Sequence, residues 1–211
     1  MDPERDTVTD DTVTDDDLGL AAAATAEPAP ERLTERLLAA ADAEDLVDVA
    51  YGVVDAPIGP LVVAATSVGL VRVSFDPADV AVADLGRRIS PRVLEIPRRL
   101  DGVRRELDEY FAGRRQRFEV PLDWRLVTGP FARRVLTHTA SIGYGRTSTY
   151  AEVAAAAGNP QASRATGSAL GANPLCVVVP CHRVLRSGGG LGGYAGGLTT
   201  KQLLLDLEAT A

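Results

Sequence analysis

Cysteine and histidine are both scarce in this chain of 211 residues. The two cysteines, Cys176 and Cys181, lie five residues apart, and on the strand expected there an odd spacing turns their side chains to opposite faces. A disulfide between them is therefore not expected, and a reduced protein fits the cytoplasm. Residues 1–120 contain neither cysteine nor histidine, so no structural zinc site is expected there. We expect no metal ion and no cofactor.

Long apolar runs are also missing. No stretch has the length and apolar character of a membrane span. The apolar segment from Leu18 to Ala24 is too short for a signal peptide, and its flanks are acidic. The sequence therefore predicts a cytoplasmic protein with no membrane partner.

The formal net charge of −7 is unevenly distributed. Residues 1–47 carry −11, residues 48–120 are neutral, and residues 121–211 carry +4. An acidic total argues against a nucleic-acid-binding protein, but the basic excess falls where it could contact phosphate groups. The acidic segment is interpreted as a solvated tail. The alternative is a tail that competes with DNA for the basic surface.

Three parts can be distinguished along the chain. Residues 1–47 are predicted to be disordered, with a possible amphipathic helix over 31–47. Residues 48–120 predict a small α/β domain, with strands over 48–55, 59–66 and 70–75 and helices over 78–89 and 98–112. This second part shows no candidate site and is expected to support residues 121–211, the third part.

The third part is predicted to be mostly helical. A helix capped by Thr128 should begin at Pro130, with Phe131, Val135 and Ile142 on its buried face. Two short helices should follow, over 150–157 and 161–170, joined by a turn of glycine, asparagine and proline. This pattern indicates a helix-turn-helix with Arg164 near the start of its recognition helix. The small residues of that helix would equally suit close packing of two helices.

The segment Val177–Val184 places a thiol directly before an imidazole, at Cys181 and His182. Three valines predict a buried strand that Pro180 ends. A free cysteine is only about 3% thiolate at pH 7, so a nucleophilic role needs a lower pKa. An imidazole that is oriented by a carboxylate can supply this, and Glu208, on a helix expected over 199–208, is the candidate. A buried structural cysteine is the alternative for the motif alone.

Taken together, these motifs resemble the methylated-DNA–protein-cysteine methyltransferase family, the O6-alkylguanine repair proteins. The resemblance is specific over 130–208, looser over 48–120 and absent over 1–47. It rests on Gly158–Asn159–Pro160, Arg164–Ala165, Asn173–Pro174, Pro180–Val184, Gly192–Gly197 and the leucine-rich helix that ends in Glu208. It implies a ribonuclease-H-like α/β domain with an antiparallel sheet. A mostly α, winged-helix-like DNA-binding and catalytic domain should follow.

The resemblance implies a function as well as a fold. A monomer would flip O6-alkylguanine, chiefly O6-methylguanine, out of double-stranded DNA and transfer the alkyl group irreversibly to Cys181, once per molecule. His182 would take the thiol proton through a water molecule, and Glu208 would orient His182. Asn173 would brace the turn before the cysteine, and Tyr150 would offer its hydroxyl to the flipped base.

The resemblance also assigns residues to DNA and base contacts. Arg164 would fill the gap that the flipped nucleotide leaves. The remaining DNA contacts would be Thr149, Ala165 and Ser187, and the base pocket would include Val184, Tyr194 and Ala195.

The sequence departs from its relatives in two places. Ala195 stands where some relatives have serine, so a hydroxyl near the guanine oxygen is missing, and bulkier alkyl groups are expected to fit. Gly171 and Ala172 stand where relatives often have an arginine, which puts one phosphate contact in doubt.

Two other functions fit parts of the pattern. A cysteine hydrolase with Cys181, His182 and Glu208 as a triad would turn over and would not need DNA; the helix-turn-helix and Arg164 argue against it. A non-repairing binder of alkylated DNA on the same scaffold would lack the reactive cysteine, which this chain has.

Overall fold

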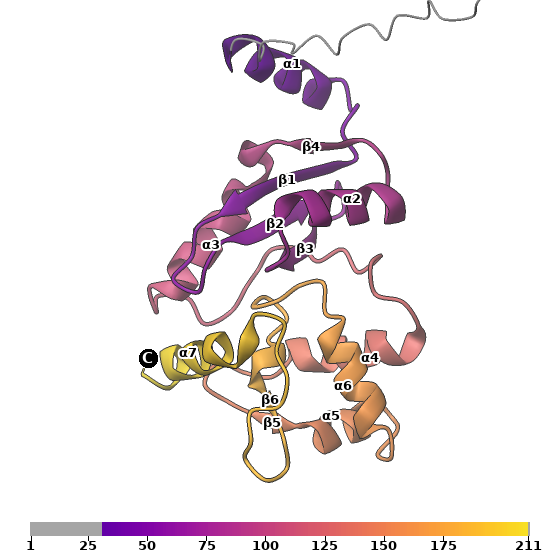
Figure 1. Ribbon diagram of the computed structural model, residues 1–211, viewed down its shortest axis with the longest axis vertical. Helices are drawn as coiled ribbons and strands as arrows, with labels where there is room; N and C mark the ends of the chain where they lie inside the picture. The colour runs from indigo at the N-terminus through magenta and orange to yellow at the C-terminus, as the bar shows by residue number, and fades with distance from the viewer. Residues whose placement is uncertain (1–30, 211) are drawn as a thin grey trace, which may run out of the picture.

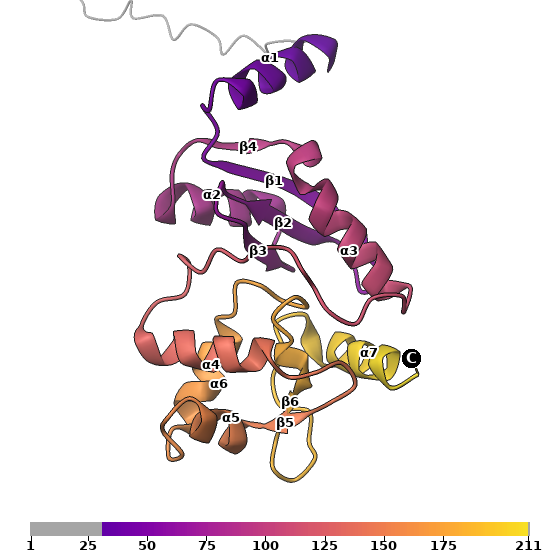
Figure 2. The ribbon, with the colours of Figure 1, turned by 180° about the vertical axis from the view of Figure 1, so that it is seen from behind.

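The computed structural model describes residues 31–210, so the disorder predicted for residues 1–30 lies outside the described residues. Two halves stack along the long axis of the molecule (Figure 1): the sheet half, residues 48–120, and the helical half, residues 121–210. Seen from behind, the segment between α3 (Asp101–Phe111) and α4 (Pro130–Ala140) runs between the two halves (Figure 2). There it forms a parallel bridge between Leu122 and Leu70.

The sheet half is built on a four-stranded sheet in the order β3-β2-β1-β4. The predicted antiparallel meander is confirmed as β1 (Val49–Val54), β2 (Leu61–Ala65) and β3 (Leu70–Ser74). The short β4 (Val93–Glu95) pairs parallel to β1 and was not predicted, because three residues carry almost no period-2 signal.

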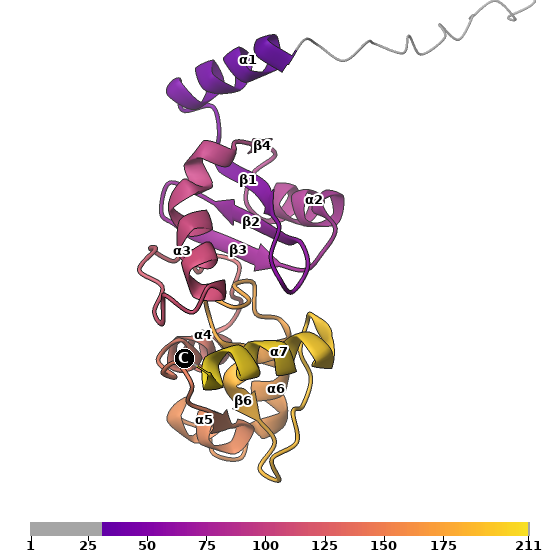
Figure 3. The ribbon, with the colours of Figure 1, turned by 90° about the vertical axis from the view of Figure 1, so that its left-hand side faces the viewer.

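Helices cover both faces of this sheet (Figure 3). The two predicted helices are confirmed as α2 (Ala78–Arg88) on one face and α3, preceded by the 3₁₀ turn η1 (Pro97–Leu100), on the other. Successive side chains of β2 point to opposite faces of the sheet and pack against the helix on each face. Val63 clusters with residues of α3, and Ala64 clusters with Leu85 of α2.

The predicted amphipathic helix is present as α1 (Glu31–Ala43). Its last turn is joined to η1 by Asp42, whose carboxylate pairs with Arg98 at 2.6 Å and Arg99 at 2.5 Å. Leu33 and Leu37 of this helix are exposed. Across residues 31–210, no helix combines the length and the apolar character that a bilayer crossing requires.

The helical half contains the predicted helix-turn-helix, formed by α5 (Tyr150–Ala156) and α6 (Ser163–Gly171) against α4. The rest of this half comprises β5 (Ser148–Thr149), the 3₁₀ turn η2 (Cys181–Arg183), β6 (Val184–Leu185) and α7 (Gly197–Ala209). β5 and β6 pair in parallel, which ties the start of the helix-turn-helix to the residues after Cys181.

The start of α4 corrects one prediction. The helix begins at Pro130 as expected, but its N-cap is Gly129, with no side-chain capping bond, and not Thr128. Gly129 has a φ of 85°, a conformation that glycine adopts without steric cost. Val135 is buried as predicted, whereas Phe131 and Ile142 are only half-buried.

The predicted strand over 177–179 is wrong. Leu175 makes a single bridge to Val73, and the chain then turns at Val177, whose φ of 70° is rare for a β-branched residue. Local hydrogen bonds occupy backbone groups that a neighbouring strand would need: the Val178 N–H donates to the Cys176 carbonyl, the Val179 N–H to the Leu175 carbonyl, and Asn173 Nδ2 to the Val179 carbonyl. The turn therefore replaces the sheet pairing that the valines favoured.

The same turn overturns the expected separation of the two cysteines. Both sulfur atoms lie beside Asn173, because Cys176 Sγ lies 3.6 Å from its backbone carbonyl oxygen and Cys181 Sγ lies 3.3 Å from its Nδ2. Both cysteines are free thiols.

Candidate active site

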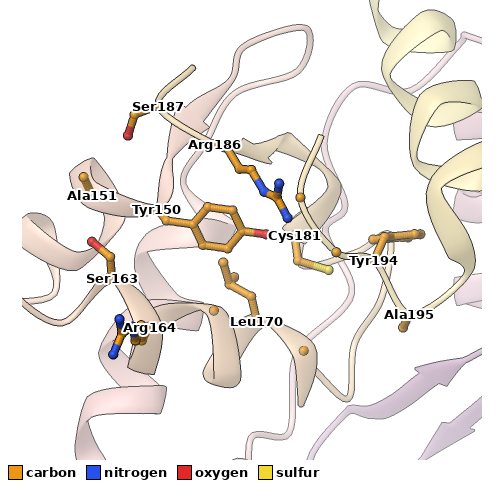
Figure 4. A pocket seen from close by; sticks show the side chains of 14 residues that line it. Tyr150, Ala151, Ser163, Arg164, Leu170, Cys181, Arg186, Ser187, Tyr194 and Ala195 are labelled. Atoms are coloured by element: carbon orange, nitrogen blue, oxygen red, sulfur yellow. The ribbon is translucent and has the colours of Figure 1, made fainter. Parts of the chain in front are cut away.

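A cavity of about 750 Å³ opens between the helix-turn-helix and the loop before α7. Its wall includes one face of α6, formed by Ser163, Gly167 and Leu170 at helical spacing. Tyr150 reaches into it from the start of α5, and the Cys181 sulfur lies at its inner end (Figure 4). The cavity therefore leads from the helix-turn-helix surface to a thiol.

The Cys181 side chain is 6% exposed and is held from behind by Asn173. Asn173 Nδ2 donates to Cys181 Sγ at 3.3 Å and to the Val179 carbonyl at 2.9 Å. The pKa of the Cys181 thiol is lowered, chiefly by a hydrogen bond from the Cys176 thiol, with further help from Asn173 and the charge of Lys201. Burial opposes this shift. The Cys181 thiol is therefore more acidic than an ordinary cysteine thiol.

His182 is completely buried, and its ring is fixed by Glu208 of α7. His182 Nε2 lies 2.9 Å from Glu208 Oε1. The pKa of Glu208 falls to about 2 despite its burial, because His182, Arg183 and Tyr110 all donate to it. An ionised carboxylate can only accept, so Nε2 carries the proton and neutral His182 has a free lone pair on Nδ1.

The His182 ring is therefore set up as a base. Nδ1 has no hydrogen-bond partner among the described residues. Burial is the main cause that lowers the pKa of His182, and it outweighs the attraction of Glu208. The imidazole is thus neutral at neutral pH and available to accept a proton.

The glycine-rich loop, residues 188–197, closes tightly over Tyr150. Burial raises the pKa of Tyr150, and a hydrogen bond from the Gly193 backbone N–H to its oxygen opposes that effect. The hydroxyl therefore keeps its proton and can donate it. Gly192 has a φ of 68°, and a Cβ there would lie 2.5 Å from the Tyr150 hydroxyl, so this approach requires glycine.

Comparison with known proteins identifies this arrangement. Residues 49–124 match the model for the ribonuclease-like domain of 6-O-methylguanine DNA methyltransferase, and residues 130–210 match the model for its DNA-binding domain. The chain belongs to the 6-O-methylguanine DNA methyltransferase family. The family resemblance seen in the sequence is confirmed, as is the two-domain fold that it implied.

Individual relatives match over most of their length. A methylated-DNA–protein-cysteine methyltransferase of Mycolicibacterium paratuberculosis is 40% identical over 163 residues, which are 75% of this chain and 91% of the relative. One from Methanosarcina acetivorans is 37% identical, over 76% of this chain and 98% of the relative. The crystal structure of Mycobacterium tuberculosis OGT in complex with DNA is 36% identical, with a TM-score of 0.67, and covers 76% and 93% of the two chains.

The cavity is lined by half of the twelve site residues that the sequence singled out. Tyr150, Arg164, Cys181, Ser187, Tyr194 and Ala195 all line it. Arg164 and Ser187 are exposed at its edge, and Tyr194 meets the His182 ring edge-on at 6.2 Å between centroids. Gly171 also lines it, and Arg186 is a lining residue that the sequence did not indicate.

Three of the expected contact residues lie elsewhere. Val184 is fully buried outside the cavity lining, and its carbonyl accepts a hydrogen bond from Lys201 at 2.6 Å. Thr149 caps α5 in a capping box with Glu152. Ala165 is exposed on α6 but does not line the cavity.

Sequence reasoning missed four residues that surround the thiol and its base. They are Tyr110, Cys176, Arg183 and Lys201. Arg183 donates to both oxygens of Glu208, at 2.9 and 2.8 Å, and Lys201, fully buried, donates to carbonyls of Val184, Leu191 and Gly193. Arg183 lies inside the recognised motif Pro180–Val184, but the motif alone does not indicate that its side chain binds Glu208. Tyr110 lies 71 positions before Cys181, and nothing local in the sequence indicates its contact.

Proposed function

We propose that this protein repairs O6-alkylguanine in double-stranded DNA by transferring the alkyl group to Sγ of its own Cys181, once per molecule. One observation carries this proposal. The cavity beside the helix-turn-helix ends on a thiol that is backed by a buried, proton-accepting His182–Glu208 pair. The chemistry therefore lies where a base extruded from duplex DNA would arrive.

We propose that the reaction uses the following proton steps. Cys181 loses its proton, through one water molecule, to Nδ1 of His182, whose Nε2–H stays on Glu208. The thiolate then attacks the alkyl carbon, and the carbon–oxygen bond breaks with its electron pair remaining on the guanine O6. Tyr150 donates its hydroxyl proton toward the leaving base, and the proton held by His182 restores the tyrosine. The products are unmodified guanine and an S-alkylcysteine.

The transfer ends the protein's activity. A thioether is a poor leaving group, so the alkyl group stays on Cys181. This separates the proposal from a cysteine hydrolase, in which water releases the acyl group and the enzyme turns over.

Base extrusion costs a few kcal/mol, which contacts with the DNA must offset. Arg164 is suited to this, because it is exposed on the second helix of the helix-turn-helix and forms no ion pair within residues 31–210. Arg186 and Ser187 on the opposite side of the cavity can contact phosphate. We further propose that the protein acts as a monomer in the cytoplasm, where its thiols stay reduced.

Intact-protein mass spectrometry tests the reaction directly. The protein is mixed with a duplex containing one O6-methylguanine, and a matched duplex with guanine serves as the control. We expect a gain of about 14 Da, one methylene in net mass, that saturates at one per protein and maps to Cys181. Cys181→Ser should keep duplex binding and lose the gain. An unchanged mass with reduced Cys181 would refute alkyl transfer.

A further inference from the structure

One contact crosses from the sheet half into the active site. Tyr110 lies on α3, is completely buried, and donates its hydroxyl to Glu208 Oε1 at 2.6 Å. Its ring packs against Phe111 and Phe118 of its own half and meets Tyr144 of the helical half edge-on. The aromatic cluster fixes the ring, so the hydroxyl reaches Glu208 without the entropy loss of a flexible side chain.

The Tyr110 hydroxyl donates to the same Glu208 oxygen that binds the catalytic His182. Glu208 Oε1 lies 2.6 Å from the Tyr110 hydroxyl, 2.9 Å from His182 Nε2 and 2.8 Å from Arg183 Nη2. The other oxygen accepts from Arg183 Nε at 2.9 Å and from the Gly145 N–H at 3.2 Å. Each carboxylate oxygen therefore has a fixed set of donors, which leaves little room for rotation.

We infer that Tyr110 is a positioning residue for the alkyl transfer: through Glu208 it sets the orientation and basicity of His182, so that the N-terminal domain forms part of the active site. This inference rests on the proposed function. Without the Tyr110 hydroxyl, Glu208 would keep its charge but lose one of its donors. It would then attract the His182 proton more strongly and hold the ring less firmly.

The hydroxyl is suited to this task because it does not ionise. Burial is the main cause that raises the pKa of Tyr110 far above its ordinary value, and the charge of Glu208 adds to it. The charged or titratable groups that face the His182–Glu208 pair from the surrounding elements are Tyr110, Tyr144, Cys181, Arg183, Tyr194 and Lys201. Near neutral pH, Tyr110 therefore remains a donor.

Tyr110→Phe removes the hydroxyl and keeps the ring. We expect the single-turnover rate of methyl transfer, followed by mass, to fall about tenfold. The acid limb of its pH profile should move to higher pH, because a carboxylate with fewer donors holds the imidazolium proton more tightly. Duplex affinity should not change, since no DNA contact is altered.

Tyr144→Phe is the matched control. It removes a hydroxyl from the same aromatic cluster, but that hydroxyl donates to the Leu207 carbonyl at 3.3 Å and not to the carboxylate. We expect a profile like that of the wild type. Circular dichroism confirms that both variants are folded before their rates are compared.

A double-mutant cycle separates positioning from packing. If Tyr110 acts through Glu208, then adding Tyr110→Phe to Glu208→Gln should cost much less than adding it to the wild type. An unshifted pH profile for Tyr110→Phe, or an equal loss in both backgrounds, would overturn the inference. A wild-type protein that transfers nothing would instead refute the proposed function.

Discussion

The two halves of the molecule bury different kinds of side chain. The sheet half has a mainly apolar interior, and its two buried charged residues, Arg72 of β3 and Glu106 of α3, lie on different elements and pair with Asp84 and Arg115. The helical half buries Asp123 and, gathered at one site, four more groups that can carry charge: His182, Arg183, Lys201 and Glu208. These four groups lie around Cys181. Glu208 and Arg183 fix the His182 ring, and Lys201 binds carbonyls of the loop before α7. The difference indicates that the first half is built for stability, whereas the second uses part of its stability to fix reactive groups.

The comparison is tested most strongly by removing a carboxylate from each half. Glu208→Ala leaves Arg183 and the imidazole buried without their partner, and we expect a loss of about 3–5 kcal/mol in the free energy of unfolding. Asp48→Ala breaks an exposed pair with Arg92, at 2.6 Å, and should scarcely change stability. Urea unfolding of both variants measures the difference. Equal losses of unfolding free energy would show that the buried network around Glu208 stabilises the protein no more than an exposed ion pair does.

The reverse test opens a cavity in the sheet half. Leu85 is fully buried on the α2 side of the sheet, away from Tyr110. Leu85→Ala should cost about 2–4 kcal/mol in unfolding free energy. The rate of methyl transfer per folded molecule should nevertheless stay at the wild-type level. A rate that falls in proportion to stability would mean that the core of this half tunes the site as well.

Acid should act first on the helical half. The folded pKa of Glu208, about 2, lies below its ordinary value of 4.5, so its stabilisation is complete above pH 4.5 and is lost as the pH falls toward 2. The pKa of His182 is also lowered, so its contribution is present above pH 6.5 and is likewise lost in acid. We expect hydrogen exchange below pH 4.5 to deprotect α7 before β2. Simultaneous exchange would contradict this order.

Sequence reasoning was accurate where the pattern is local. The strands β1 to β3 follow alternation or apolar runs between turn residues, and α2, α3 and α7 follow helical periodicity, so each could be placed within about four residues. Cys181, His182 and Glu208 were found because they belong to a motif or end a helix. β4 was missed because a three-residue strand gives almost no signal.

The failures arose where specific hydrogen bonds override the local propensity. The valine run at 177–179 has high strand propensity, but the backbone hydrogen bonds of the turn and the Asn173 side chain occupy groups that a strand would use. Tyr110 looks like an ordinary core aromatic of α3, and its role depends on how the two halves dock. Propensity and periodicity indicate neither property.

The thiol pair offers a finer test of the helical half. Cys176→Ala removes a donor to Cys181, so the pKa of the Cys181 thiol should rise, and transfer near neutral pH should slow by less than about tenfold. Cys176→Ser keeps a donor and should retain a lowered pKa. Ultraviolet absorbance of the thiolate against pH measures the shift. The same pKa in all three proteins would exclude Cys176 as a donor.

The smallest expected effect concerns the exposed rim of the cavity. Ala195 lines the cavity with a methyl group where some relatives have serine, so Ala195→Ser adds one hydroxyl without disturbing buried groups. We expect transfer from O6-benzylguanine to slow a few-fold and transfer from O6-ethylguanine to change less, because a single atom at a pocket wall discriminates weakly. Paired rate measurements on duplexes that carry each lesion give the ratio directly. A ratio that does not change would mean that the glycine loop yields to bulky groups, and that the selectivity for alkyl size lies deeper, near Tyr150 and Cys181.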